Sequence, residues 1–89
     1  MLSNRQLERH VKGFANHRRI QIMMLLNQRP ELSLLEISQV LRINFKTAGE
    51  HTRRLHIAGL ISKRNLWNCV IHKLNARGKT VLKFLRTLE

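Results

Sequence analysis

The chain has 89 residues, of which 17 are Lys or Arg and only 5 are acidic, so its formal net charge is +12. All the acidic residues are Glu, and they are scattered along the chain. Without Asp or paired carboxylates, the chain lacks the residues for carboxylate acid–base catalysis, for a Ser-His-Asp triad and for a Mg²⁺ or Ca²⁺ site. An enzyme is therefore not expected, and the excess of positive charge favours a polyanionic partner.

The hydrophobic fraction of 43% is sufficient for one folded domain over residues 1–89. The longest apolar run, residues 20–26, is far shorter than the roughly 20 residues that cross a bilayer, and the first residues lack the pattern of a secretory signal. Cys69 is the single cysteine, so no disulfide can form within the chain, and we expect Cys69 to be a small buried hydrophobe. These features predict a cytoplasmic protein with no membrane partner.

Two helices are predicted in the N-terminal third of the chain. Leu7, Val11 and Phe14 recur at helical spacing, which predicts a helix over about residues 4–15. Asn16 follows as a cap, and the broad apolar side of residues 17–28 predicts a second helix that is largely buried.

The third and fourth helices are separated by the three residues 42–44. Ser33 and Glu36 form a capping box that begins a short helix ending near residue 42. Asn44 is placed to cap the next helix, over residues 45–58, and Gly59 closes that helix. The side chains expected on its inward face are Phe45, Ala48, Thr52 and Leu55.

From residue 61 the hydrophobic period changes from helical to alternating. This change predicts short strands over residues 61–64 and 69–74, joined by residues 65–68. Asn75 is placed to cap a last helix, which carries an apolar stripe. The expected fold class is therefore mainly α with a small β-hairpin: a winged helix-turn-helix of about five helices plus a two-stranded wing.

The two short helices before the basic hairpin indicate a protein that binds double-stranded DNA. A helix-turn-helix presents the N-terminal residues of its second helix to base edges in the major groove. The side chains expected to contact base edges are Lys46, Thr47, Glu50 and His51. Glu50 is equally well explained as a neutraliser of the basic side chains around it, and His51 is alternatively a polar surface residue.

A second set of side chains is better suited to phosphates, which position a protein on DNA without specifying sequence. These are Arg18, Arg19, Arg42, Arg53, Arg54, Lys63, Arg64 and Trp67. Arg19 is equally able to bond a neighbouring carbonyl. Trp67 has three alternatives: the DNA backbone, another subunit, or packing over Leu66.

Several segments resemble the ArsR/MarR-like winged-helix transcription regulators. They are residues 16–23, 34–41, 44–55, 58–61 and 74–78. The segment 44–55, with its Asn-aromatic-Lys-Thr opening, is especially similar to small archaeal members. Arg42 stands where a turn Gly is common in these regulators, and Gly49 and Glu50 stand where Ser and Arg are frequent. The DNA sequence preferred by a relative therefore does not transfer to this chain.

The resemblance implies a DNA-binding regulator that is a homodimer joined through its N- and C-terminal helices. It places helix 45–58 in the major groove and the wing, 61–74, on the backbone or in the minor groove. The dimer contacts expected on this basis are Leu7, Val11, Phe14, Val81, Leu85 and Leu88.

No cofactor or metal is expected. The histidines do not cluster with Cys69, and residues 34–37 read Leu-Leu-Glu-Ile where ArsR-type metal sensors often carry Cys ligands. The predicted function is sequence-specific regulation of transcription, in the cytoplasm and on the nucleoid, with no small-molecule effector identified. Two alternatives remain open: non-specific DNA packing, and a winged-helix module that docks on protein or structured RNA.

Overall fold

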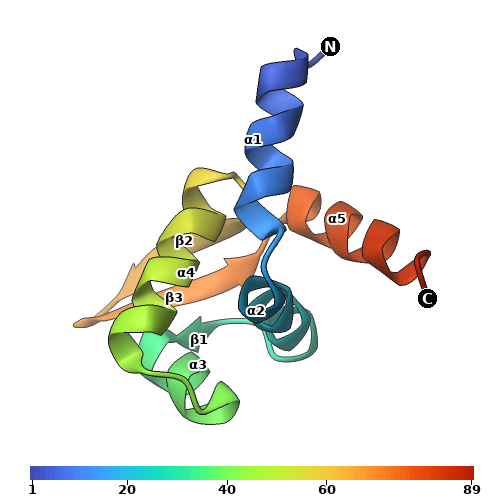
Figure 1. The fold of residues 1–89 in the computed structure, drawn as a ribbon. Helices are drawn as coiled ribbons and strands as arrows, with labels where there is room; N and C mark the ends of the chain where they lie inside the picture. Colours follow the sequence, from blue (N-terminus) through green and yellow to red (C-terminus); the bar gives the residue numbers. More distant parts are fainter.

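The computed structural model describes residues 1–89 as five helices and a three-stranded antiparallel sheet (Figure 1). The helices are α1 (Asn4–Phe14), α2 (His17–Gln28), α3 (Leu34–Leu41), α4 (Phe45–Ile57) and α5 (Ala76–Arg86). The strands are β1 (Leu32–Ser33), β2 (Ile61–Leu66) and β3 (Cys69–Leu74), in the order β1-β3-β2. The winged helix-turn-helix class with a two-stranded hairpin is confirmed, and the sheet has one further strand, β1, that the sequence did not predict.

The additional strand, β1, precedes α3 and pairs with the wing. Leu32 pairs with His72 and Ser33 with Ile71, so a segment before the helix-turn-helix is tied to the hairpin that follows it. The backbone of Ser33 is extended because it is also the N-cap of α3. Two residues are too few to show an alternating pattern, which is why the sequence did not predict this strand.

The predicted caps are confirmed at the helix N-termini. Side chains of the expected capping residues accept hydrogen bonds from backbone N–H groups at Asn16, Ser33, Asn44 and Asn75. The start of α1 has a further capping box, in which Ser3 and Gln6 bond each other's backbone N–H groups at 3.2 and 2.8 Å. These bonds satisfy donors that a helix end otherwise leaves without partners.

The core lies where α2, α3 and α4 meet the base of the sheet. Its largest fully buried apolar side chains are Ile22, Met23, Leu26, Ile37, Leu55, Leu60, Ile61 and Leu74. Burying each such side chain stabilises the fold by about 1.5–3 kcal/mol. On α4, Ala48, Thr52 and Leu55 face inward as expected, but Phe45 does not: it begins the helix, outside the core, and is 54% exposed.

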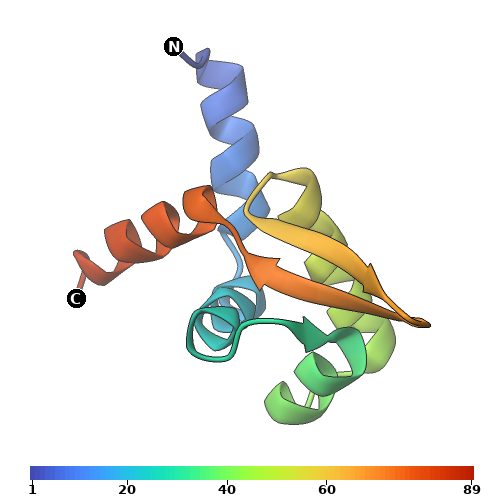
Figure 2. The same cartoon turned by 180° about the vertical axis from the view of Figure 1, so that it is seen from behind.

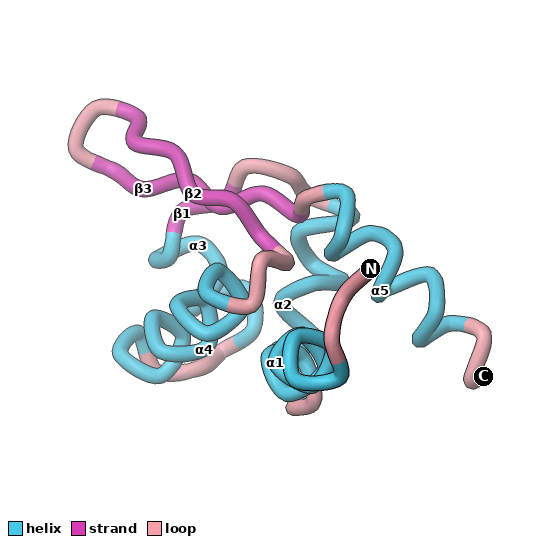
Figure 3. Tube along the Cα trace, turned by 90° about the horizontal axis from the view of Figure 1, so that it is seen from above, coloured by secondary structure: helices cyan, strands magenta, loops and turns pink.

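The hairpin is longer and its turn tighter than expected. β2 continues to Leu66, which pairs with Cys69, so only Trp67 and Asn68 form the turn. Helices cover only the base of this hairpin, and its distal half extends into solvent (Figure 3). The expected burial of Cys69 is therefore wrong, because this residue lies at the exposed end of β3.

The helix-turn-helix and the terminal helices occupy different parts of the molecule. Figures 1, 2 and 3 show the tip of the β2–β3 hairpin and the C-terminal end of α5 at opposite ends, and Figures 1 and 2 show α1 extending away from the body. The last turn of α1 lies against the C-terminal end of α4. No helix of this chain is both long enough and apolar enough to span a membrane.

Candidate nucleic-acid interface

The first turn of α4 presents two polar side chains to solvent. The Asn44 side-chain oxygen accepts from the backbone N–H groups of Lys46 and Thr47 at 2.8 and 3.3 Å. Because Ala48 is fully buried, the helix is held with Lys46 and Thr47 outward. Neither side chain has an ion pair, and both lie at the positive end of the helix macrodipole. Two of the base-edge candidates therefore have free side chains.

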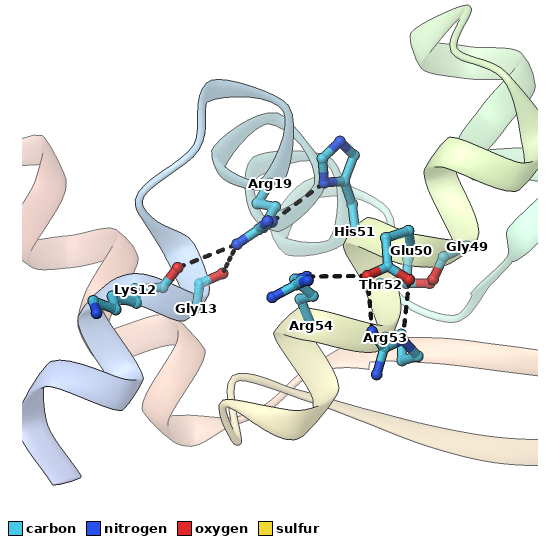
Figure 4. A network of polar contacts seen from close by, with 9 residues as sticks. All are labelled: Lys12, Gly13, Arg19, Gly49, Glu50, His51, Thr52, Arg53 and Arg54. Carbon is cyan, nitrogen blue, oxygen red and sulfur yellow. Dashed lines mark hydrogen bonds and ion pairs between the residues drawn. The ribbon is translucent and has the colours of Figure 1, made fainter. Parts of the chain in front are cut away.

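Glu50, one turn later, is fully engaged by two arginines (Figure 4). Arg53 binds it through two nitrogens, Nε at 3.0 Å and Nη2 at 2.8 Å, and Arg54 Nε donates at 3.0 Å. These hydrogen bonds lower the pKa of Glu50 to about 2 and raise the pKa of Arg53. In the free protein Glu50 thus balances neighbouring charge, one of the two roles that the sequence allowed.

His51 faces α2 and is only partly exposed. Its Nδ1 accepts from Arg19 Nε at 3.2 Å, so the proton of the neutral ring is on Nε2, which points away from Arg19 in Figure 4. Burial, reinforced by the positive charge of Arg19, lowers the pKa of His51. His51 is therefore neutral at pH 7 and retains one outward N–H donor.

Arg19 connects three elements rather than extending into solvent. Its Nη1 donates to the carbonyl oxygens of Lys12 at 3.1 Å and Gly13 at 3.2 Å, at the C-terminal end of α1. Burial and the charge of Arg54 lower the pKa of Arg19. Of the two roles considered for Arg19, the bond to neighbouring carbonyls is the one the structure shows.

Two further phosphate candidates lie on the helices that precede α4. Arg18, at the start of α2, donates from Nη1 to Gln21 at 3.1 Å and is partly exposed. Arg42 is exposed and ends α3 with a left-handed backbone, φ 55° and ψ 46°. That conformation explains why a turn Gly is common there in the resembling family, and Arg42 adopts it without a glycine.

The wing contributes two basic side chains and an aromatic one. Lys63 and Arg64 are exposed on β2, and Arg64 also pairs with Glu31 at 2.7 Å. Trp67, at the turn, has φ 59° and is 95% exposed. Its side chain does not fold back over Leu66, so only external contacts remain for it.

Comparison with protein families gives a match over more than half of the chain. The family described as "Bacterial regulatory protein, arsR family" matches residues 16–63, from the cap of α2 through α3 and α4 to the start of β2. The chain belongs to the ArsR family. The resemblance predicted from the sequence is confirmed, and the matched segment contains all four base-edge candidates. This ArsR-family protein is thus a winged helix-turn-helix of the kind found in DNA-binding transcription regulators.

Solved structures match nearly the whole ArsR-family chain. HlyU from Vibrio cholerae is 31% identical with a TM-score of 0.82, over 99% of this chain and 97% of that one. The transcriptional regulator HlyU from Vibrio vulnificus is 32% identical with a TM-score of 0.72, over 88% and 81%. The homodimeric winged helix-turn-helix DNA-binding domain of a possible ArsR-family regulator from Mycobacterium bovis is 24% identical, with a TM-score of 0.85 over 99% and 87%. No curated protein matches the chain by sequence.

Potential metal ligands are dispersed in this ArsR-family protein. No three His, Cys or Glu side chains come together as the ligands of a metal ion would. His72, on β3, is buried instead, and its Nδ1 donates to the carbonyl oxygen of Leu32 on β1 at 3.1 Å. The residues present therefore do not fit a metal site built within one chain.

Five of the six predicted dimer residues retain exposed surface. Leu7 and Val11 on α1 are 48% and 50% exposed, and Leu88, beyond the end of α5, is 69% exposed. Val81 and Leu85 are half-buried against the core. These side chains still have apolar surface that a second chain could cover.

The sixth, Phe14, is a core residue of the single chain. It is only 9% exposed, so association can bury little more of it. Phe84 on α5, which is not among the six predicted dimer residues, is 55% exposed. Phe14 ends α1 where the chain turns into α2, and helical spacing alone does not reveal which apolar residue of a stripe meets the core.

Sequence reasoning missed one feature of the interface, the contact between Arg19 and His51. The two residues are 32 positions apart, and no motif links them. The sequence does contain a signal for another feature, a basic side of α1, because Arg5, Arg9 and Lys12 recur at helical spacing. That basic side of α1 lies next to α4.

Proposed function

We propose that this protein is a sequence-specific, double-stranded-DNA-binding transcription regulator that acts as a homodimer. The first turn of α4 enters the major groove, and the wing, residues 61–74, lies on the backbone or in the minor groove. The observation that carries the proposal is the exposed, capped start of α4, where Lys46 and Thr47 have no partner in the chain.

The contacts proposed for α4 follow from hydrogen-bond chemistry. Lys46 is a donor suited to the acceptor atoms of guanine, and Thr47 can bond to several bases or contact a thymine methyl group. His51 offers its Nε2–H to a base or a phosphate. Glu50 contacts a cytosine amino group only if DNA draws it away from Arg53 and Arg54, which hold it in the free protein.

The remaining basic side chains are proposed to position the protein on phosphates. Arg18 and Arg42 lie on the helices beside α4, and Lys63 and Arg64 lie on the wing. Trp67 extends from the tip of the wing and is proposed to pack on the sugar-phosphate backbone. Such contacts fix orientation and affinity rather than base preference.

Dimerisation is supported by the apolar surface of the terminal helices. Four apolar side chains of these segments are about half exposed or more. They are Leu7 and Val11 on α1, Phe84 on α5, and Leu88 just after the end of α5. The Mycobacterium bovis neighbour, which has the same fold, is described as homodimeric. A dimer would present two copies of α4 to a pseudopalindromic site and regulate transcription by occlusion or recruitment, on the nucleoid in the cytoplasm.

Selection from a pool of random duplexes tests this function. An enriched motif with two-fold symmetry supports the proposal, and size-exclusion chromatography with light scattering at micromolar concentration should give twice the chain mass. Tight binding without enrichment contradicts sequence specificity and indicates DNA packing. Failure to bind any duplex contradicts DNA binding and indicates docking on protein or structured RNA.

A further inference from the structure

A basic cleft lies between α1 and the C-terminal half of α4. It is open to solvent, and its volume is about 630 Å³. Six cationic side chains line it, with Glu8 as the one acidic residue. The cationic residues are Arg5, Arg9, Lys12, Arg19, Arg53 and Arg54.

The walls of the cleft are fixed in the free protein. Gly13 of α1 lies so close to Ala58 at the end of α4 that a Cβ at Gly13 would overlap the Ala58 side chain. His10 Nδ1 donates to the Ala58 carbonyl at 2.6 Å, and Arg19 bonds the end of α1 from the other side. An anion entering the cleft would therefore meet two helices whose relative position is already set.

The positive charge in the cleft is only partly balanced. Glu8 pairs with Lys12 at 3.8 Å, and both side chains are largely exposed. Arg5 and Arg9 have no ion pair. Arg54 uses only its Nε to bond Glu50, which leaves both terminal nitrogens of its guanidinium without an ion pair. The cleft therefore has planar guanidinium donors that match the geometry of a phosphate group.

The cleft and the apolar surface of α1 use different sides of the helix. Arg5, Arg9 and Lys12 follow each other at spacings of four and three, so they share one side. Leu7 and Val11 lie about half a turn away from them. A dimer contact through Leu7 and Val11 therefore leaves the cleft open.

We propose that the cleft between α1 and α4 is a phosphate-binding site, and that the phosphate it holds belongs to the DNA backbone beside the bases contacted by α4. The assignment to DNA rests on the proposed function. Arg53 and Arg54 belong to both surfaces, and Arg54 lies about 12 Å from Lys46 along the helix axis, which is about three to four base steps. The α1 helix then contacts DNA as well as the second chain.

The test compares two variants that each lose two positive charges. Arg5→Gln/Arg9→Gln alters the cleft, and Lys83→Gln/Arg86→Gln alters the exposed last turn of α5. Affinity for one duplex is measured over a range of salt concentrations, with thermal unfolding of each variant as a check on folding. Each lost phosphate contact lowers the slope of log K against log salt by about 0.9, so the cleft variant, which loses the contact with one phosphate, should lose about 0.9 from the slope. The α5 variant should retain the slope of the unaltered protein.

The same variants separate failure of this inference from failure of the proposed function. The slope can be measured on a mixed-sequence duplex, so it does not depend on base preference. Equal slopes for the cleft and α5 variants overturn the inference even if a preferred motif exists. If inorganic pyrophosphate stabilises the unaltered protein against heat but not Arg5→Gln/Arg9→Gln, while their DNA slopes agree, the site takes a free phosphorylated molecule and the assignment to DNA is wrong.

Discussion

The two ends of α4 carry their polar side chains in different ways. At the N-terminal end, Lys46 and Thr47 extend into solvent without partners. Further along, Arg53 and Arg54 are held by Glu50, and His51 is held by Arg19. On the proposed function, the free side chains contact bases and the held arginines contact phosphates, which position a protein on DNA without specifying sequence. We propose that α4 separates specificity from affinity along its length in this way.

Substituting Gly13 with Ala should have the largest effect, because it separates α1 from the held end of α4. The new Cβ overlaps Ala58, and overpacking of this kind lowers the free energy of unfolding by about 1–3 kcal/mol. Gly49, in the N-terminal half of α4, is the matched control, since a Cβ there meets only the Leu34 side chain at 3.4 Å. Gly49→Ala should be neutral or stabilising. Urea unfolding with equal losses for both variants would contradict the difference between the two ends.

Substituting Arg19 should loosen the same end without adding volume. Arg19→Gln removes the bonds to His51, Lys12 and Gly13, and the expected loss in the free energy of unfolding is about 1 kcal/mol. Arg18→Gln, which removes a single exposed bond to Gln21, is the control and should change stability less. If the two variants unfold at the same urea concentration, Arg19 does not connect α1 to α4 as described.

Glu50→Gln should release the held arginines and make the two ends of α4 more alike. It removes one negative charge and the ion pairs to Arg53 and Arg54, so every duplex should bind more tightly, with a salt slope steeper by about 1. The control duplexes differ only by exchange of C·G pairs within the site. Weaker binding confined to duplexes with one particular cytosine would show instead that Glu50 contacts that base.

Lowering the pH should destabilise the folded protein through His51, which Arg19 holds on α4, and this is the smallest of the expected effects. The folded-state pKa of His51 is lowered, so below about pH 6.5 the unfolded chain binds more protons than the folded one, and the free energy of unfolding falls as pH falls. His72 contributes in the same direction, because burial lowers its pKa too. Urea unfolding of His51→Gln between pH 7.5 and 5 should therefore show a shallower loss. An equal loss in His51→Gln and in the unaltered protein would contradict this role of His51.

Local signals in the sequence predicted much of the fold. The caps at Ser33 and Asn44 were visible because capping depends on residues within one turn of each other. Glu50 also lies within about one turn of Arg53 and Arg54, so their pairing was one of the two roles that the sequence allowed for Glu50. Exposure of Lys46 followed from the apolar residues on the opposite side of α4.

Features that depend on distant parts of the chain were not predicted. β1 exists because residues 32–33 meet residues 71–72, and the bond between Arg19 and His51 joins residues of α2 and α4. Phe45 and Cys69 were expected to be buried from their local patterns, but each lies at an end that no other element covers. The basic cleft required the packing of α1 against α4, which no local pattern encodes.

The most direct measurement of the division within α4 is the specificity of Lys46→Ala, taken as the ratio of its affinities for the selected duplex and a scrambled one. If Lys46 contacts a base edge, this ratio should fall, and the difference in binding free energy between the two duplexes should shrink by about 1–3 kcal/mol relative to the unaltered protein. Arg53→Ala, one of the held residues, should weaken both duplexes alike and leave the ratio unchanged. An unchanged ratio for Lys46→Ala would contradict the account, because the free end of α4 would then contribute only charge.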